Sequence, residues 1–378
     1  MKIVVSQLSS REIANYGELF RKYNLEEKIV LVDFGIPSTR SMRILKFLLL
    51  LVKNISSCRK LFFYFKNKRS RNFNFMFEWN FYKHFKNADI FHIQYGTNHK
   101  PLDELKKCGL YKMPVITTFH GHDAFFPING FIPKENYYET LFKYTELFTA
   151  NTPYLEEQLL KIDCPPEKIS TLPVGVDINF FTGKTKKGID LNLINLLSVG
   201  RLEEIKGHKM GIKAVKNLRK EGININYTII GEGSLRNKLC QLVDDHNLKG
   251  HVILKGSMSQ KKIMNYMHNS DIFLMTSTVV NGDTRETQGL VALEAQSCNL
   301  PIVAFKSGGV AYTVKDGVTG FLVLENDLDS FTSKIRELIE NSTLYSEMTK
   351  NSREFVKDNY CHSKLFDSWE DIYKSLKL

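Results

Sequence analysis

The second half of the chain alternates short apolar runs with helical patterns, and this alternation constrains the fold more than any other feature. The runs lie at 194–199, 227–230, 252–254, 272–275 and 302–305, and the first two are followed directly by glycine. Apolar runs of this length, bounded by turn residues and separated by helical stretches, are typical of buried parallel strands. The sequence therefore predicts a parallel α/β sheet in this half.

The first half carries a second set of such patterns. Candidate strands lie at 2–6, 28–33, 89–93, 115–118 and 147–150, and candidate helices at 41–53, 73–85 and 153–161. Between the halves, residues 182–190 combine glycines with lysines, as interdomain linkers do. A chain of 378 residues is long enough for two domains. We expect two Rossmann-like parallel-sheet domains facing across a cleft, 1–176 and 177–358, followed by a helical segment at 359–378.

Composition limits the class of protein. An apolar content of 43% and a charged content of 25% are ordinary for a soluble globular enzyme. The six cysteines form no close pairs, which predicts reduced packing residues instead of a disulfide framework or a zinc site. The first residues contain no apolar run of signal-peptide length, so we interpret them as the first strand.

Residues suited to a nucleotide follow the predicted strands of the second half. Ligands of open parallel sheets bind beyond the carboxyl ends of the strands. The residues at these positions are Arg201, Lys206, Gly231, Gly233, Lys255, Gly256 and the loop that holds Glu286. Arginine and lysine donate to phosphate oxygens, and glycine lets the backbone approach a ligand closely. The Gly231–Gly233 pair is equally compatible with a tight turn alone.

The segment 281–309 contains two glutamates, Glu286 and Glu294, on either side of Gly289. The residues after Gly289 resemble the start of a helix, whose first N–H groups and partial positive charge favour a bound phosphate. The predicted phosphate cradle consists of Gln288, Gly289, Leu290 and Val291. A carboxylate before the helix, the cradle and a second carboxylate two turns later together predict a nucleotide-sugar site.

In the first half, His120, His122 and Asp123 follow an apolar strand. Two histidines and an aspartate at this spacing can ligate a metal. No further ligand in the chain completes a convincing set, so we predict no metal site. His92 and Gln94 end the preceding strand and are candidates for the same cleft.

The motifs of the second half closely resemble those of retaining GT-B glycosyltransferases of family 4. The motifs are GRLEEIKG, ETQGLVALEA, LPIVAFKSGGV and DGVTGFLV. The resemblance implies that Glu286 lies against the donor sugar and Glu294 binds the ribose hydroxyls. It also implies that Arg201 and Lys206 hold the donor diphosphate.

The resemblance extends less fully into the first half. It assigns His120 to the donor sugar, across the cleft from Glu286, and Asp123 to the sugar or the acceptor. One departure follows the first strand, where members of this family usually have a glycine-rich loop. Residues 6–11 read SQLSSR and contain no glycine. The acceptor side therefore has no matching motif, and residues 1–87 resemble the family hardly at all.

The expected activity is retaining transfer of a sugar from a UDP- or GDP-sugar to an acceptor hydroxyl, in surface polysaccharide or glycolipid assembly. The resemblance implies a front-face mechanism, in which the leaving phosphate takes the acceptor proton. We expect no cofactor besides the donor substrate. Two alternatives share the fold: a sugar-nucleotide epimerase and a non-catalytic module that binds nucleotide-sugars.

Positive charge is concentrated near the N-terminus. Residues 1–100 contain 18 Lys or Arg against 7 Asp or Glu, a net of +11 that equals the net charge of the whole chain. The densest part is 40–71, where basic residues alternate with apolar ones. The apolar run 47–52 is far shorter than the ~20 residues that span a bilayer. This pattern predicts peripheral attachment to an anionic membrane on its inner face. A solvated basic surface is the alternative, and no nucleic-acid motif accompanies the charge.

Overall fold

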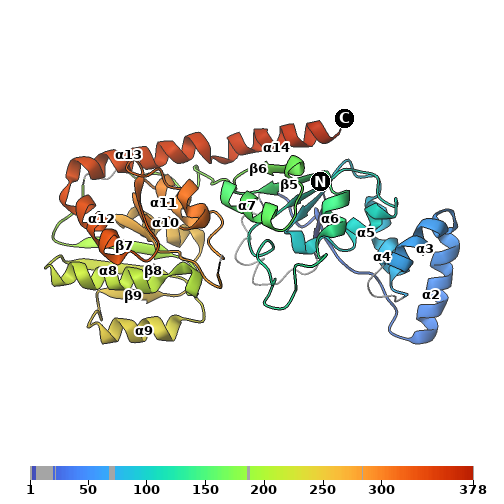
Figure 1. Cartoon of the computed structure of the whole chain (residues 1–378), viewed down its shortest axis with the longest axis horizontal. Helices are drawn as coiled ribbons and strands as arrows, with labels where there is room; N and C mark the ends of the chain where they lie inside the picture. Colours follow the sequence, from blue (N-terminus) through green and yellow to red (C-terminus); the bar gives the residue numbers. More distant parts are fainter. Residues whose placement is uncertain are drawn as a thin grey trace.

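The computed structural model describes residues 2–5, 20–21, 23–67, 73–184, 188–282 and 284–377. Two α/β units lie side by side, and a helical arm extends from the unit that contains the N-terminus (Figure 1). The predicted class of two parallel-sheet domains is confirmed.

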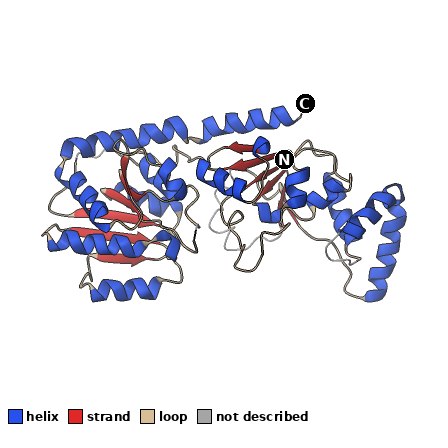
Figure 2. Cartoon of the chain, viewed as in Figure 1, coloured by secondary structure: helices blue, strands red, loops and turns tan. Residues whose placement is uncertain are grey.

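The C-terminal sheet is entirely parallel, with the strand order β12-β11-β10-β7-β8-β9. Its strands are β7 (Ile194–Val199), β8 (Ile225–Ile230), β9 (Val252–Lys255), β10 (Ile272–Met275), β11 (Ile302–Phe305) and β12 (Gly320–Val323). Its helices are α8 (His208–Lys220), α9 (Arg236–Asp245), α10 (Gln260–His268), α11 (Leu290–Ser297), α12 (Leu328–Glu340) and α13 (Ser342–Asn359). Helices cover the sheet (Figure 2).

Burial explains the apolar runs of this sheet. Every residue of β10 and β11 is buried, because helices pack on both faces and leave no solvent-facing side. The five predicted strands are confirmed. The edge strand β12, which was not predicted as a strand, adds to β11 in register.

The N-terminal domain has a parallel sheet of order β3-β4-β5-β6. Its strands are β3 (Phe91–Gln94), β4 (Val115–Thr118), β5 (Leu147–Ala150) and β6 (Ile169–Thr171). Helices α5 (Leu102–Lys107), α6 (Glu139–Tyr144) and α7 (Pro153–Lys161) connect them. The predicted strands 2–6 and 28–33 appear as β1 (Ile3–Val5) and β2 (Ile29–Leu31), which pair with each other in a separate sheet. They were expected in the main sheet, and this expectation was wrong for the described strands.

The arm lies between β2 and β3 in the sequence. It consists of α2 (Arg40–Lys53), α3 (Cys58–Asn67) and α4 (Phe75–Tyr82). Aromatic side chains pack in its interior. The ring centroid of Phe75 lies 5.9 Å from that of Phe47 and 5.2 Å from that of Phe65. No helix in the described part of the chain is both long and apolar enough to span a bilayer.

The last helix returns to the N-terminal domain. After α13, the chain pairs with the interdomain segment through a parallel bridge between Val176 and Cys361. Helix α14 (His362–Leu376) then runs back along the N-terminal domain (Figure 1). Its side chains Trp369 and Tyr373 contact His92 of β3. The predicted limits at 176 and 359 lie at this junction.

Candidate active site

The loops after β7 and β8 pack directly on one another at the carboxyl edge of the C-terminal sheet. Leu202 N donates to Glu232 O at 2.9 Å, which continues the pairing of the two strands. A Cβ at Gly231 would lie 1.9 Å from Gly200 O, and one at Gly233 would lie 2.5 Å from Leu202 O. Both glycines are thus required by packing between the loops, whether or not a nucleotide also approaches them.

Gly256 follows β9 at the same edge. A Cβ there would lie 2.7 Å from Glu232 Oε1, so the Glu232 carboxylate occupies the space above this glycine. The predicted residues Arg201, Gly231 and Gly256 therefore belong to neighbouring loops. Arg201 is exposed, and its carbonyl oxygen lies 3.2 Å from Nε2 of the buried His208. Burial lowers the pKa of His208 to about 4, so this histidine is neutral at pH 7.

Lys206 lies in the short 3-10 helix η5 (Glu204–Lys206), and the backbone fixes its position. Gly207 adopts φ +58°, and a Cβ there would lie 2.0 Å from Thr276 O, at the end of β10. Thr276 Oγ1 donates to Lys206 O at 2.9 Å. Because only glycine fits between η5 and β10, the lysine is attached rigidly to the sheet edge.

Lys206 and Glu286 form an ion pair between their Nζ and Oε2 atoms. About one sixth of each side chain is exposed, at 17% and 18%. These residues are separated by 80 positions in the sequence. The fold thus brings together the two residues to which the sequence assigned a phosphate and a sugar contact.

Glu294 lies in α11, which begins after Gly289 at φ +84°. A Cβ at Gly289 would lie 2.6 Å from the Met275 side chain, so the helix start packs closely on β10. Partial burial raises the pKa of Glu294 to about 7. This carboxyl is therefore about equally ionised and neutral near pH 7, which is unusual for glutamate.

The loop before α11 contacts the N-terminal domain. Thr287 Oγ1 donates to His120 O at 2.9 Å, and Thr152 Oγ1 donates to Thr287 O at 2.6 Å. Gln288 is buried, and its amide both donates to Val174 O (2.8 Å) and accepts from Val174 N (3.0 Å). The side chain of Gln288, predicted to bind the donor, is thus occupied by the interdomain segment. Of the other cradle residues, Leu290 is exposed and Val291 partly buried.

Asp123 is fully buried and organises the opposite loop. Its carboxylate accepts hydrogen bonds from the backbone N–H groups of Gly96 (2.7 Å), Gly121 (2.8 Å) and His120 (3.0 Å). This arrangement gives Asp123 a positioning role, because it ties two loops together. Direct contact of Asp123 with a sugar or acceptor stays a prediction.

His120 lies at the domain interface, with Nε2 at 2.8 Å from Gln94 Oε1. Burial lowers its pKa, so the imidazole is neutral at pH 7. A neutral, half-buried imidazole can contact a sugar hydroxyl. Within the described ranges, no group of three or more His, Cys, Asp or Glu is arranged to hold a metal ion.

Tyr95 is a site residue that the sequence did not indicate. It has φ +66°, although it is not glycine, and the residue is 40% exposed. The ring centroid lies 4.4 Å from that of His120 and 5.1 Å from that of His122. Strained backbone at an exposed aromatic residue is frequent at binding sites. No local motif predicts it, because the strain arises from how β3 meets the next turn.

His92 lies under α14, against Trp369 and Tyr373. Its Nδ1 lies 2.8 Å from the Tyr373 hydroxyl, and its Nε2 lies 2.7 Å from Thr118 Oγ1. The expectation that His92 lines the cleft stays a prediction, since His92 Nε2 also lies 3.1 Å from Nε2 of Gln94. Its neighbour Gln94 is exposed and does contact His120. The loop 6–11 lies outside the described residues.

Comparison with known proteins identifies the class. The protein family described as "Glycosyl transferases group 1" matches residues 180–355, and the family described as "Glycosyltransferase Family 4" matches residues 51–180. The solved structure of Anabaena HepE in complex with UDP is similar in fold, with a TM-score of 0.68 and 18% identity, over 79% of this chain and 82% of that one. The fold and both matches therefore define a GT-B glycosyltransferase.

More particularly, the two domain matches support family 4. Among curated proteins, the chain is 27% identical to the putative colanic acid biosynthesis glycosyltransferase WcaL of Salmonella typhimurium, over 72% of this chain and 67% of WcaL. It is 30% identical to the amylovoran biosynthesis glycosyltransferase AmsK of Erwinia amylovora, over 66% of this chain and 61% of AmsK. The matches span about two thirds of the length of each relative.

Proposed function

We propose that the protein transfers a sugar, with retention at the anomeric carbon, from a nucleoside-diphosphate sugar to an acceptor hydroxyl in surface polysaccharide or glycolipid assembly. The observation that carries the proposal is the ion pair between Lys206 and Glu286. It joins a cation suited to phosphate and a carboxylate suited to a sugar at the carboxyl edge of one parallel sheet, where ligands of such sheets bind.

The cations have a definite part in the proposed reaction. When the bond between the anomeric carbon and the phosphate oxygen breaks, negative charge develops on the leaving diphosphate. Arg201 and Lys206, held at the sheet edge, stabilise this charge. The acceptor oxygen bonds to the same carbon on the same face, and its proton passes to the leaving phosphate oxygen. Glu286 would orient the donor sugar and stabilise the positive charge on its ring.

The nucleoside would lie over the loops after β8 and β9, with its ribose hydroxyls donating to Glu294. Anabaena HepE has been crystallised with UDP and with UDP-glucose. These complexes favour a uridine donor, and GDP-sugars are the second class to test. His120 would contact the sugar from the N-terminal domain. We place the reaction at the inner face of an anionic membrane, to which the basic first hundred residues would be attracted.

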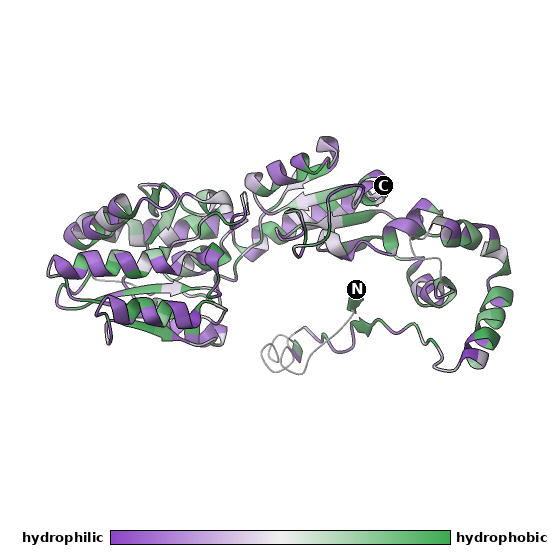
Figure 3. Cartoon of the chain, turned by 60° about the horizontal axis from the view of Figure 1, so that its bottom comes forward, coloured by the Kyte–Doolittle hydropathy of each residue, from purple (hydrophilic) through white to green (hydrophobic). Residues whose placement is uncertain are grey.

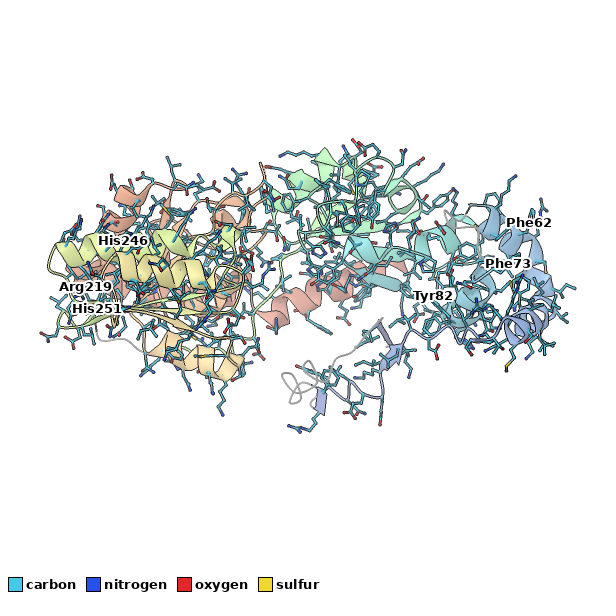
Figure 4. The ribbon with its side chains drawn as sticks, turned by 90° about the horizontal axis from the view of Figure 1, so that it is seen from below. Phe62, Phe73, Tyr82, Arg219, His246 and His251 are labelled. Carbon is cyan, nitrogen blue, oxygen red and sulfur yellow. The ribbon has the colours of Figure 1, made fainter. Side chains whose placement is uncertain are left out.

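A panel of nucleotide-sugars tests the proposal. UDP-glucose, UDP-galactose, UDP-N-acetylglucosamine and GDP-mannose would each be added to the purified chain, and its melting temperature measured. A ligand at 100 times its Kd stabilises the native state by about 2.7 kcal/mol. The ligand that raises the melting temperature of the wild type should act much less on Arg201→Ala. The matched control is Arg219→Ala, at the end of α8 distant from the site (Figure 4).

Transfer itself distinguishes the alternatives. With the donor so identified and a membrane extract as the source of acceptor, NMR of the product should show the anomeric configuration of the donor. Release of an epimerised nucleotide-sugar without acceptor would favour the epimerase, and binding without either reaction would favour the non-catalytic module. EDTA should leave transfer unchanged, whereas loss of activity that Mg²⁺ restores would contradict the metal-free scheme.

Substitution of the two glutamates should have different effects, one on donor binding and the other on turnover. Glu294→Ala should raise the Kd of the donor, because the ribose loses its acceptor. Glu286→Ala should lower turnover by about 10²-fold, as loss of a preorganised charge-stabilising group does. Wild-type transfer by both variants would show that the site has been assigned wrongly.

A further inference from the structure

Helix α2 of the arm is apolar on two opposite faces. One face consists of Phe47, Leu50 and Leu51, at the spacing i, i+3, i+4, and packs toward α4. The other begins two residues earlier and consists of Leu45, Leu48, Leu49 and Val52, at the spacing i, i+3, i+4, i+7. Two residues correspond to about 200° around a helix, so the second face points away from the arm's core.

The outer face is exposed. The exposed fractions are 61% for Leu45, 52% for Leu48, 54% for Leu49 and 70% for Val52. Monomeric proteins rarely expose large contiguous apolar patches. The outer face of α2 therefore has the character of a contact surface.

Neighbouring residues enlarge this surface. Ile55 follows α2 and is 74% exposed, and Phe62 of α3 is 68% exposed. Phe73, in the turn before α4, is 64% exposed. Phe62 and Phe73 lie at the end of the molecule opposite His246 and His251 of the C-terminal domain (Figure 4). Hydrophobic colouring is extensive on the arm (Figure 3). We call Leu45, Leu48, Leu49, Val52, Ile55 and Phe62 the apolar face.

The charge around the apolar face indicates what covers it. From Phe34 to Phe77 the sequence contains ten Lys or Arg and no Asp or Glu. Among the described ones, Arg59, Lys60 and Lys66 are exposed on α3 beside Phe62, and Lys53 is exposed at the end of α2. A second copy of the chain would bring two such positive surfaces together, which is unfavourable. An anionic lipid surface complements both the charge and the apolar side chains.

The dimensions fit a helix that lies in the interface. Helix α2 has 14 residues, about 21 Å at 1.5 Å per residue. The hydrocarbon core of a bilayer is ~30 Å thick, so a helix of this length does not span it. Lying flat, α2 would insert its leucines into the boundary of the acyl chains, while the basic residues remain at the headgroups.

We propose that the arm inserts the apolar face of α2 and α3 into an anionic membrane, and does not merely adhere to it by charge. This inference is independent of the sugar-transfer reaction, because it concerns a surface of the N-terminal domain. If the proposed function is correct, insertion would also hold the N-terminal domain at the membrane surface, where a lipid-linked acceptor lies.

The test compares two triple variants of the full chain. Leu45→Ser/Leu48→Ser/Leu49→Ser removes the centre of the apolar face. Leu160→Ser/Leu191→Ser/Leu324→Ser is the matched control, since these leucines are also exposed but lie outside the arm. Binding to sedimenting vesicles of phosphatidylcholine with phosphatidylglycerol would be measured at low salt and at 1 M salt, where the Debye length is only ~3 Å.

Insertion predicts that the wild type and the control keep part of their binding at 1 M salt. The arm variant should bind at least about 100-fold more weakly, since each inserted leucine contributes about tenfold. Loss of all wild-type binding at 1 M salt, or equal binding by both variants, would overturn insertion in favour of attraction by charge. Absence of wild-type binding to any vesicle would overturn it as well.

Three further measurements test what covers the apolar face. If the apolar face is open to solvent in the free chain, the serine substitutions leave the melting temperature unchanged. A clear fall would mean that another part of the protein covers these leucines, and would overturn the proposal. Dimers that dissociate in the arm variant, seen by analytical ultracentrifugation, would assign the face to a second copy.

In Leu49→Trp, vesicles should shift the new tryptophan emission to the blue, and an unshifted emission contradicts insertion.

Discussion

At the scale of single residues, the two carboxylates of the site have opposite surroundings. Glu286 has a cation for a partner, whereas Glu294 is partly buried in α11 and its pKa is raised to about 7 by desolvation. A raised carboxyl pKa means that the folded state holds a proton which the unfolded state releases. The stability contributed by this proton is fully present below pH 4.5 and is lost as the pH rises to about 7.

Glu294→Gln should therefore change the pH dependence of folding. A shift from 4.5 to about 7 corresponds to roughly 3 kcal/mol of unfolding free energy, lost between these pH values in the wild type. The glutamine variant lacks this ionisation, so it should be more stable than the wild type at pH 8 and similar at pH 4. Urea unfolding at both pH values measures this difference. A constant difference would show that Glu294 does not ionise with a raised pKa.

Tyr95 allows a test of backbone strain. A non-glycine residue at φ +66° costs roughly 1–2 kcal/mol. Tyr95→Gly and Tyr95→Ala both remove the ring that contacts His120, but only glycine relieves the strain. The glycine variant should thus be more stable than the alanine variant by about 1 kcal/mol. At Tyr312, an equally exposed tyrosine in the 3-10 helix η6 (Gly308–Tyr312), the order should be reversed, because glycine weakens helical backbone.

The site residues differ in how far local sequence could predict them. Lys206 and Glu286 could be predicted to lie at the same sheet edge, because both follow strands of one parallel sheet, but their ion pair was not predicted. Asp123 and Gln288 are polar residues in suitable loops, yet their polar atoms bond to backbone groups of distant segments. Such roles depend on tertiary neighbours, which the residue type does not encode.

At the scale of elements, glycines decide how the sheet-edge loops meet. Gly207 and Gly222 both have positive φ, at +58° and +87°. A Cβ at Gly207 would lie 2.0 Å from a backbone oxygen, whereas nothing lies within 4 Å of one at Gly222. The two positions therefore separate backbone strain from steric collision.

Gly222→Ala should cost about 1–2 kcal/mol of unfolding free energy, from the left-handed conformation alone. Gly207→Ala should cost clearly more, because η5 must also move away from β10. That movement displaces Lys206, so donor binding should weaken in Gly207→Ala and remain normal in Gly222→Ala. Denaturant melts and donor titrations measure the two effects. Equal losses of unfolding free energy in the two variants would mean that η5 moves away from β10 without strain.

The C-terminal strands could be predicted because each is a buried apolar run. The strand β12 begins with glycine and follows a turn, so its residues resembled a loop motif. In the N-terminal part, β1 and β2 pair apart from the β3-β4-β5-β6 sheet, and periodicity does not indicate to which sheet a strand belongs. Of the arm helices, α2 and α4 correspond to the predicted helices at 41–53 and 73–85, whereas α3 was not predicted.

At the scale of the whole molecule, helix α14 fastens one domain to the other. His92 of β3 lies beneath it, against Trp369 at 4.9 Å between ring centroids. Lys377 extends the contact by an ion pair with Asp89 at 3.4 Å. The two domains are also joined by the hydrogen bonds of Thr287 and Gln288, which belong to the candidate active-site loop before α11. The loop that holds Glu286 therefore also joins the two domains.

Acid should loosen this attachment at His92. Burial beneath α14 lowers the His92 pKa from 6.5 to about 4, with a smaller contribution from the nearby His120. The folded state thus binds fewer protons than the unfolded chain between these values. Stability is fully present above pH 6.5 and falls as the pH decreases toward 4, by roughly 3 kcal/mol for this histidine.

The variant His92→Gln should be less stable than the wild type at pH 7, because it loses the bonds to Tyr373 and Thr118. Its stability should fall less steeply between pH 6.5 and 4, so the two curves should converge in acid. His84→Gln, at an exposed histidine of the same domain, is the control and should follow the wild-type slope. Parallel curves for His92→Gln and the wild type would mean that His92 does not resist protonation. Convergence would identify the junction beneath α14 as an acid-sensitive contact between the two domains.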